Sequence, residues 1–407
     1  MNPSFTISIT CVIAEMLLCT ASSHAQWVQT KGPSVPQIHC LAICGSSLFA
    51  GTDGGVFLST NSGESWNAAN TGLSMTDVRC FAVSGNNVFA AVYGRGVFLS
   101  TNNGQSWADT DSDLTNMYVQ ALAINDTHIF AGGDLGAVSH STNNGATWVP
   151  VNIGLTMSTV YVMAAGEANL FAGTWGAGVF LSTDNGQTWD SANTGITNDY
   201  VQALLINGNL FAGTQGAGVF LSSNSGTSWV TSNVGLTNLY VFAMAASGTY
   251  LFVGTYGSGV FRSNNGGSWA AVNDGLTSPH IYALTAGNGN LFAGTASSGV
   301  WRRPLSEMIT AVDSDPGPIV SEPFLRQNFP NPFNPSTTIR YGLPQRSHVT
   351  LAVFNTLGQQ VAQLVNGDME AGYHEVKFDG SKLASGVYLY RMQAGSYVET
   401  RKLLLVR

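Results

Sequence analysis

Short apolar runs alternate with glycine-rich polar turns along most of the chain. Residues 119–124 read Val-Gln-Ala-Leu-Ala-Ile, and a second kind of run is Leu48-Phe49-Ala50-Gly51-Thr52. Further runs follow a glycine turn, as at residues 179–182 (Val-Phe-Leu-Ser), or begin at a tryptophan, as at Trp189. Such short runs bounded by turn residues are typical of β-strands, and no apolar period of 3.6 residues indicates a helix between residues 26 and 306. The pattern therefore predicts an all-β fold.

The same set of four strands recurs along the chain. The Leu-Phe-Ala-Gly-Thr phrase that starts at Leu48 returns, with variation, at Val88, Ile129, Leu170, Leu210, Leu251 and Leu291, in steps of 40 or 41 residues. A period of this length with only strand-like content is typical of one four-stranded blade of a β-propeller. Seven copies predict seven blades between residues 26 and 306.

The two ends of this region complement each other. The last repeat stops after Val300-Trp301-Arg302-Arg303 and lacks a fourth strand, whereas Trp27 begins a strand with no repeat before it. We therefore expect the strand of Trp27 to complete the seventh blade by pairing with the strand of Trp301, which leaves no wide unpaired sheet edge.

A polar signature precedes most of the strand-starting tryptophans. It reads Ser59-Thr60-Asn61-Ser62-Gly63-Glu64-Ser65-Trp66 in the first repeat. It resembles the Asp-box, or bacterial neuraminidase repeat. In this chain, Asn stands at the Asp position in four of the five full copies, and Asp184 is the exception. The resemblance implies a structural hairpin between the third and fourth strands, with the tryptophan packed between sheets. The implied structural residues are Asn61, Gly63, Trp66, Trp107, Trp148, Asp184, Trp189, Trp229 and Trp269.

The N-terminus is typical of a secretory signal. Residues 7–18 are mostly apolar, and Ser23-His24-Ala25 supplies the small residues of a cleavage site before Gln26. We interpret residues 1–25 as a signal peptide, although no basic residue precedes the apolar run and Glu15 interrupts it. No later segment is long enough to predict a transmembrane span. Cleavage leaves Cys40, Cys44 and Cys80. Cys40 and Cys80 occupy equivalent positions in neighbouring repeats, and we interpret them as small buried residues; whether two of the three cysteines form a disulfide stays open.

A second domain follows a polar, proline-bearing linker at residues 307–323. Residues 324–407 contain alternating strands that suit a small immunoglobulin-like sandwich. The runs Asn331-Pro332-Phe333-Asn334-Pro335, residues 355–359 and residues 383–388, together with the aliphatic and basic tail at 401–407, closely resemble the C-terminal sorting domain of type IX secretion cargo. This resemblance implies the type IX secretion machinery as a partner, and an extracellular or outer-membrane surface location.

Composition and motifs argue against most chemistry. The net charge of −8 makes a nucleic-acid partner improbable, because phosphates need a basic face. The arginine cluster of a sialidase is missing, the histidines are scattered without metal-ligand spacing, and no phosphate-binding loop is present. Asp77 and Asp199 lie in equivalent loops three blades apart and are the one carboxylate pair to weigh for a glycoside hydrolase. We favour ordinary turn roles for both, and expect no enzyme activity, cofactor or metal.

One set of positions varies while the framework repeats. If the tryptophan hairpins mark one face, the opposite face carries the turns after the second strands and the loops before the first strands. These positions hold Asp53, Tyr93, Asp134, Trp175, Gln215 and Tyr256, with Tyr118, Tyr200 and Tyr240. Aromatic rings with polar neighbours suit a glycan or a protein ligand, so the sequence favours a binding or adhesion module with a secreted glycoside hydrolase as the alternative. It is equally open that each tyrosine only covers the edge of a neighbouring blade.

Overall fold

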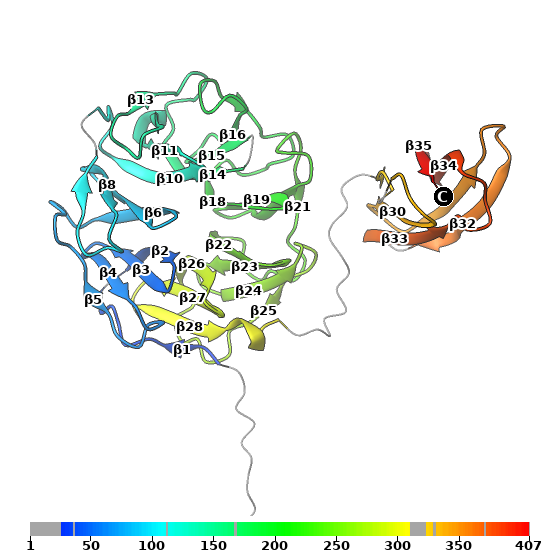
Figure 1. Ribbon diagram of the computed structural model, residues 1–407. Coiled ribbons are helices and arrows are strands. Elements are labelled where there is room, and N and C mark those ends of the chain that lie inside the picture. Colours follow the sequence, from blue (N-terminus) through cyan, green and yellow to red (C-terminus); the bar gives the residue numbers. More distant parts are fainter. Residues whose placement is uncertain are drawn as a thin grey trace, which may run out of the picture.

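The computed structural model describes residues 26–309 apart from 36, 111–112 and 167–168, and residues 323–406 apart from 329–330 and 370–371. The expected signal peptide and most of the expected linker lie outside these residues. Seven four-stranded antiparallel sheets surround a central channel (Figure 1), which confirms the predicted all-β propeller.

The blades follow one another along the chain, with the first strand of each innermost. Blades 1 to 3 consist of β2 (Ile38–Cys44), β3 (Ser47–Thr52), β4 (Gly55–Ser59) and β5 (Asn67–Ala68); β6 (Val78–Ser84), β7 (Asn87–Val92), β8 (Gly96–Ser100) and β9 (Ala108–Asp109); and β10 (Val119–Asn125), β11 (His128–Gly133), β12 (Val138–Ser141) and β13 (Val149–Pro150), with the one-turn 3₁₀ helix η1 (Asp134–Gly136) after β11.

Blades 4 to 6 repeat this order, and blade 7 takes its last strand from the N-terminus. They consist of β14 (Val160–Ala165), β15 (Leu170–Thr174), β16 (Val179–Ser182) and β17 (Asp190–Ser191); β18 (Val201–Asn207), β19 (Asn209–Thr214), β20 (Gly218–Ser222) and β21 (Val230–Thr231); β22 (Val241–Ser247), β23 (Tyr250–Thr255), β24 (Gly259–Asn264) and β25 (Ala270–Ala271); and β26 (Ile281–Gly287), β27 (Asn290–Thr295), β28 (Val300–Pro304) and β1 (Val28–Gln29), followed by η2 (Leu305–Glu307).

The repeated Leu-Phe-Ala-Gly-Thr phrase forms the second strand of a blade, and its residues have separate roles. The phenylalanine is buried in every blade, for example Phe49 and Phe211. The glycine lets the next blade approach, since a Cβ on Gly173 would lie 2.7 Å from a methyl group of Val201. The threonine closes the turn that follows, because the Thr174 hydroxyl donates to the carbonyl of Gly178 at 2.8 Å.

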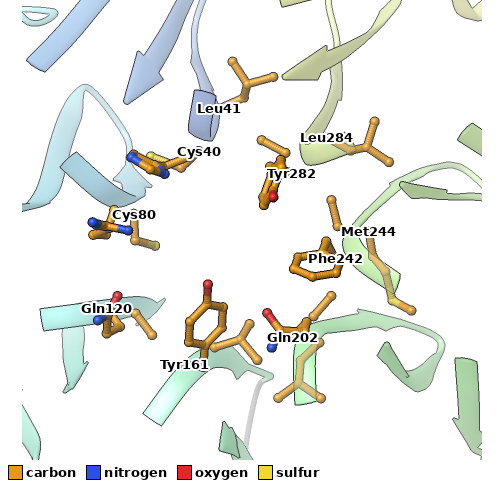
Figure 2. A pocket seen from close by; sticks show the side chains of 18 of the residues that line it. Cys40, Leu41, Cys80, Gln120, Tyr161, Gln202, Phe242, Met244, Tyr282 and Leu284 are labelled. Carbon is orange, nitrogen blue, oxygen red and sulfur yellow. The ribbon is translucent and has the colours of Figure 1, made fainter. Parts of the chain in front are cut away.

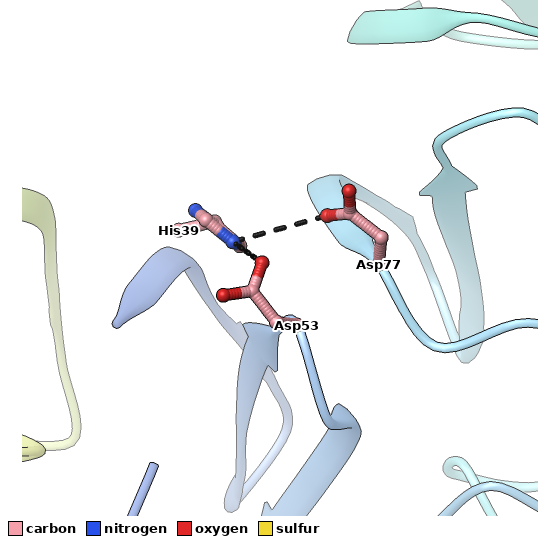
Figure 3. Close-up of side chains that lie close together, drawn as sticks. All are labelled: His39, Asp53 and Asp77. Atoms are coloured by element: carbon pink, nitrogen blue, oxygen red, sulfur yellow. Dashed lines mark hydrogen bonds and ion pairs between the residues drawn. The ribbon is translucent and has the colours of Figure 1, made fainter. Parts of the chain in front are cut away.

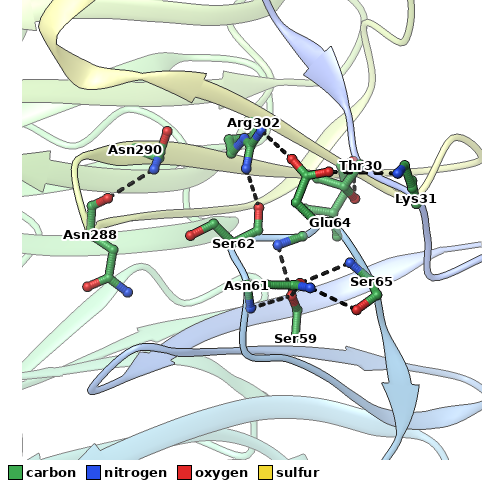
Figure 4. Close-up of polar contacts among 12 residues, drawn as sticks. Thr30, Lys31, Ser59, Asn61, Ser62, Glu64, Ser65, Asn288, Asn290 and Arg302 are labelled. Carbon is green, nitrogen blue, oxygen red and sulfur yellow. Dashed lines mark hydrogen bonds and ion pairs between the residues drawn. The ribbon is translucent and has the colours of Figure 1, made fainter.

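The third and fourth strands are joined by the polar hairpins that end at residues 66, 107, 148, 189 and 229. In the first, the Gly63 N–H donates to the Ser59 hydroxyl at 2.8 Å, and the Ser65 N–H donates to Asn61 Oδ1 at 2.9 Å (Figure 4). Asp184 accepts the equivalent N–H bond from Thr188 at 2.9 Å, and hydrogen bonds from the side chain and N–H of Thr188 lower the pKa of its carboxyl. Asn and Asp therefore stabilise the same turn.

The tryptophans hydrogen-bond each blade to the one before it. The indole N–H of Trp107, for example, donates to the Ala69 carbonyl at 2.7 Å, and that of Trp189 to the Val151 carbonyl at 2.8 Å. Equivalent indole–carbonyl bonds are made by Trp27, Trp148, Trp229 and Trp269. Trp66 differs: its indole donates to the Thr30 hydroxyl at 3.2 Å, and its ring is only half-buried.

The ring closes as the sequence predicts. In β1 and β28, Val28 pairs with Arg302 and Gln29 with Trp301. The Trp27 indole donates to the carbonyl of Val272 in blade 6, and Arg302 in β28 bonds the Glu64 carboxylate at 2.9 Å and the Ser62 carbonyl at 2.8 Å in blade 1 (Figure 4). The N-terminal strand thus belongs to the same inter-blade contacts as every other fourth strand.

Residues 323–406 form a separate two-sheet sandwich. One sheet has the order β29 (Phe324–Leu325), β30 (Ser336–Leu343), β33 (Gly372–Asp379); the other has the order β32 (Gln360–Met369), β31 (Ser347–Phe354), β34 (Gly386–Ala394), β35 (Tyr397–Leu405). Both sheets contribute to a core of its own that includes Tyr341, Leu351 and Tyr390. The predicted sandwich is confirmed.

The closure gives the first testable prediction. Trp27→Ala should lower the free energy of unfolding by about 3–5 kcal/mol, because the ring is 3% exposed and carries the blade 6 to blade 7 bond. Chemical denaturation would measure the change. Val28→Ala is the matched control on the same strand; its side chain is 56% exposed, so the cost should stay within about 0.5 kcal/mol. Equal effects of the two substitutions would contradict the closure.

Candidate functional site

The strand register places the variable turns and the tryptophan hairpins on opposite faces. In blade 1, Thr52 pairs with Gly55 at one end of the β3–β4 ladder, and Leu48 pairs with Ser59 at the other. Ile38, at the start of β2, pairs with Thr52. The start of each inner strand and the turn after each second strand therefore share one rim, which we call the turn face.

A β-bulge occurs near the start of every inner strand. The register shifts between Val119 and Ala121 in blade 3 and between Val201 and Ala203 in blade 5, and the other five blades shift at the equivalent place. A bulge redirects the side chain of its extra residue. The seven bulged residues, which we call the bulge ring, are His39, Arg79, Gln120, Tyr161, Gln202, Phe242 and Tyr282.

The bulge ring surrounds a cavity at the mouth of the channel. The cavity has a volume of about 250 Å³ and is lined by all seven inner strands. Figure 2 shows Tyr161, Gln202, Phe242 and Tyr282 around this space, with Cys40 and Cys80 on the opposite side. Burial raises the pKa of Tyr161 and of Tyr282, so both hydroxyls stay protonated at neutral pH and can donate hydrogen bonds.

The three cysteines among the described residues are not paired. Cys40, Cys44 and Cys80 are free thiols; Cys44 is buried, while Cys40 and Cys80 are half-buried in the channel wall. Burial raises the pKa of Cys40, and it raises that of Cys80 to about 11, so both side chains remain neutral thiols. Cys40 and Cys80, interpreted from the sequence as small buried residues, are thus only half-buried and line the cavity.

Blades 1 and 2 form a charged sector of the mouth. His39 Nε2 lies 2.6 Å from Asp53 Oδ1 and 3.8 Å from Asp77 Oδ1 (Figure 3). Arg79 bonds Asp77 at 2.6 Å. The ligand atoms of the histidine and the two aspartates lie within 4.8 Å of one another, a set that suits a divalent cation. Arg79 already contacts one of these carboxylates and competes for that role. Histidine spacing in the sequence does not reveal this group, because its members come from different strands and loops.

Asp134 joins blades 2, 3 and 4 on the same rim. Its carboxylate accepts a bond from the Tyr93 hydroxyl at 3.2 Å and one from the Thr159 hydroxyl at 3.3 Å. Burial and the Asp134 charge raise the pKa of Tyr93. The Tyr93 ring also meets the edge of Tyr118 at 5.1 Å and lies 5.3 Å from the Arg79 guanidinium.

Blades 4 to 7 form an aromatic sector with two clusters. In the first, Trp175 lies 5.7 Å from Tyr161 and 5.3 Å from Tyr200, measured between ring centroids. In the second, Tyr256 lies 5.7 Å from Phe242, 4.4 Å from His280 and 6.1 Å from Tyr282. Backbone bridges join Trp175 to Tyr200 and Gln215 to Tyr240 across blade boundaries.

The predicted turn-face residues thus lie on one rim but not in one cluster. Asp53, Tyr93, Asp134, Trp175 and Tyr256 each contact a bulge-ring residue or the next blade. Tyr118, Tyr200 and Tyr240 cover blade boundaries and are also exposed, so covering an edge and offering a ring to a ligand are compatible roles.

The carboxylates weighed for hydrolysis are placed differently from each other. Asp77 directly precedes β6 and faces His39 and Arg79, whereas Asp199 lies one residue further from β18. The Asp199 carbonyl accepts N–H bonds from Gly176 and Gly178, and its side chain is exposed. Although the loops are equivalent, the two residues are not.

Gln202 is the residue that the sequence argument missed. It lies in the bulge ring of blade 5, between the two aromatic clusters, and is 4% exposed. Neither its amide nitrogen nor its amide oxygen has a hydrogen-bond partner in the part of the chain that the structure describes. A signal for the bulge ring exists in the repeats: the position after the first Val or Ile of each inner strand changes in nearly every blade, while its neighbours stay small or aliphatic.

Comparisons with known proteins identify the second domain and the fold of the first. The family described as Secretion system C-terminal sorting domain matches residues 327–406. This domain implies export by the secretion machinery to the cell surface or the extracellular space. No helix among the described residues has the length and apolar character that a membrane crossing requires. A search of curated proteins found no match.

Solved propellers resemble the chain at low sequence identity. PorZ, a surface component of the type IX secretion system of Porphyromonas gingivalis, aligns over 93% of this chain and 61% of its own at 18% identity and a TM-score of 0.54. YCF48 from Cyanidioschyzon merolae aligns over 69% and 98% at 14% identity and a TM-score of 0.55. The xyloglucanase of Xanthomonas campestris aligns over 78% and 59% at 15% identity and a TM-score of 0.55. These likenesses show the fold alone, and the chain spans less than two thirds of PorZ and of the xyloglucanase.

The state of Gln202 gives the second prediction. Gln202→Leu should leave the melting temperature unchanged or raise it, because a buried amide without protein partners gains nothing from its burial. Thermal unfolding of the purified chain would measure this. Gln187→Leu, at an exposed residue of a hairpin on the opposite face, is the control for the exchange itself. A clear loss of stability specific to Gln202→Leu would show that the amide has a structural role.

Proposed function

We propose that the propeller is a secreted or cell-surface binding and adhesion module without enzymatic activity, and that its turn face takes a glycan or protein ligand at the channel mouth. The observation that supports this is Gln202, a buried amide with free hydrogen-bonding capacity that lies between two aromatic clusters. Buried polar groups are nearly always hydrogen-bonded, so an exception at the rim of a cavity points to a missing ligand.

Binding fits the carboxylates better than hydrolysis does. A glycoside hydrolase needs two carboxyl groups free to face one bond of the substrate. Asp77 is held by Arg79 at 2.6 Å, and Asp53 is held by His39 at 2.6 Å. Both are partners in a charged network, which fixes the shape of the mouth. Glycoside hydrolysis by an Asp-box propeller remains the alternative.

We further infer that the polar hairpins are of the Asp-box type. The inference is supported by the equivalent bonds of Asn61 and Asp184, each of which accepts the N–H of the residue four positions later. These hairpins lie on the face opposite the channel mouth and serve the blade contacts, so the ligand role and the structural role occupy opposite faces.

Ligand binding should depend on Trp175. Trp175→Ala should weaken binding by about 2- to 13-fold, the equivalent of the 0.5–1.5 kcal/mol that a stacked ring contributes beyond its buried area. The melting temperature should change little, since the ring is 44% exposed. Binding of the purified chain to arrays of immobilised glycans and of unglycosylated extracellular proteins would measure the first effect, and thermal unfolding the second.

Two results would contradict this prediction. Trp189→Ala is the control at a buried hairpin tryptophan and should cost about 3–5 kcal/mol of stability. If Trp175→Ala destabilised the chain equally, its ring would be structural packing. If the chain instead hydrolysed a glycan, and the Asp77→Ala/Asp199→Ala double variant lost that turnover, the protein would be an enzyme.

Export should require the sorting domain. A chain that ends at residue 323 should accumulate inside the outer membrane of the native host, whereas the full chain should reach the surface or the medium. Cell fractionation with antibodies to the propeller would detect both. The two forms share the propeller and its N-terminus, so a truncated chain that still reached the surface would disprove the role assigned to residues 324–407.

A further inference from the structure

We propose that the channel mouth binds an uncharged sugar ring, the terminal unit of a glycan, which sits between the two aromatic clusters and hydrogen-bonds to Gln202. This inference rests on the proposed binding function and names the class of ligand. Hydrogen-bond type, aromatic surface, charge and shape each limit what can fill the mouth.

The amide of Gln202 selects for a ligand that both donates and accepts hydrogen bonds. Its oxygen accepts and its nitrogen donates, and both lack partners. An ammonium group only donates and a carboxylate only accepts, so either would leave one buried amide atom unpaired. Both atoms are buried in the free protein, so the Gln202 side chain must turn into the cavity that it lines. Neighbouring hydroxyl groups on a sugar ring can then satisfy both atoms. The Tyr161 and Tyr282 hydroxyls, protonated because burial raises their pKa values, add two more donors and acceptors to the same cavity wall.

The flanking aromatic rings offer apolar surface on both sides of this amide. Blade 4 supplies Tyr161 and Trp175 on one side, and blade 6 supplies Phe242 and Tyr256 on the other. Trp175 and Tyr256 are 44% and 45% exposed, which leaves ring surface free for contact. A pyranose ring has apolar C–H faces and polar hydroxyl edges, and this combination matches rings at the sides and an amide at the base.

The opposite side of the mouth disfavours anionic ligands. Arg79 and His39 line this side of the cavity, and each bonds a carboxylate at its edge, Asp77 and Asp53 respectively. The nearest positive charge is therefore already paired, and further carboxylates lie close by. Arg95 is exposed on the same rim but does not line the cavity. Inside the cavity, a sialic or uronic acid, a sulfated sugar or a phosphate would therefore meet a guanidinium that is already paired with a carboxylate.

The shape of the cavity admits only the terminal ring of a glycan. All seven inner strands contribute to its wall, so a polymer cannot pass through sideways as it would in an open groove. Its volume of about 250 Å³ is below the roughly 300–1,000 Å³ of sites for drug-sized ligands. One ring enters, and the remainder of a glycan must continue outward over the turn face, past Trp175, Tyr200 and Tyr256.

Calorimetric titration of the purified full chain with single sugars tests this directly. The probes are the methyl glycosides of glucose, galactose and mannose together with N-acetylglucosamine and N-acetylgalactosamine, each matched against glucuronic acid and sialic acid. At least one neutral sugar should bind, and both acids should bind at least about 10-fold more weakly.

Two variants link the binding to Gln202. Gln202→Leu should weaken the neutral sugar at least about 10-fold without lowering the melting temperature, and Gln202→Glu, which keeps the shape but loses the donor, should weaken it as well. Gln187→Leu on the opposite face is the control and should bind like the unaltered chain.

The results separate this inference from the proposed function. Tighter binding of an acidic sugar, or neutral binding that Gln202→Leu leaves intact, would overturn the neutral-sugar site. If no sugar bound but an unglycosylated protein did, and Gln202→Leu abolished that contact, the ligand would be a protein and the binding function would stand. If neither sugars nor proteins bound, both proposals would fail.

Discussion

The arrangement of the propeller depends on the closing of its ring. Every inner strand has its position in the channel only because the neighbouring blades hold it, and the last of these contacts is made by a two-residue strand from the other end of the propeller region. Trp27 gives blade 7 the indole–carbonyl bond that blades 2 to 6 also make, and the β1–β28 pairing gives it a fourth strand like that of every other blade. Without them the channel mouth, and with it the convergence of seven bulged side chains, has no fixed geometry.

Much of this fold was predictable because the same packing and hydrogen-bond constraints recur in each of the seven blades. Gly173 and Gly213 stand where a Cβ would collide with the next blade. The Thr174 hydroxyl closes a turn, and the Trp189 indole donates to a carbonyl of the preceding blade. Such constraints appear in a sequence as constant positions at a fixed period, so they gave the blade count, the closure and the face that carries the hairpins. The sandwich was equally predictable from alternating strands and its characteristic runs.

The sequence pointed only to the rim residues of the candidate site, for a physical reason. The outer rings, such as Trp175 and Tyr256, stand at turns, where a large residue is conspicuous against glycine. Gln202 instead lies inside a strand whose alternation reads as ordinary, and only the bulge after Val201 turns it into the channel. Contacts such as that of His39 with Asp53 and Asp77 join residues of two blades. The spacing of residues within one repeat cannot predict such contacts. A one-residue difference likewise separates Asp77 from Asp199 in loops that look equivalent.

The proposed binding site on bulged strand residues has consequences for how the protein would acquire a ligand. Val201, beside the bulge, packs against blade 4 and is constrained, whereas the Gln202 amide has no hydrogen-bond partner among the described residues. Its side chain can therefore change without disturbing the framework. The backbone that presents it is held by sheet pairing and inter-blade tryptophans, so little ordering is left to be done when a ligand enters. In loops, a variable side chain usually stands on a flexible backbone. Here the variable residue stands in the innermost strand of the blade, so its backbone is rigid.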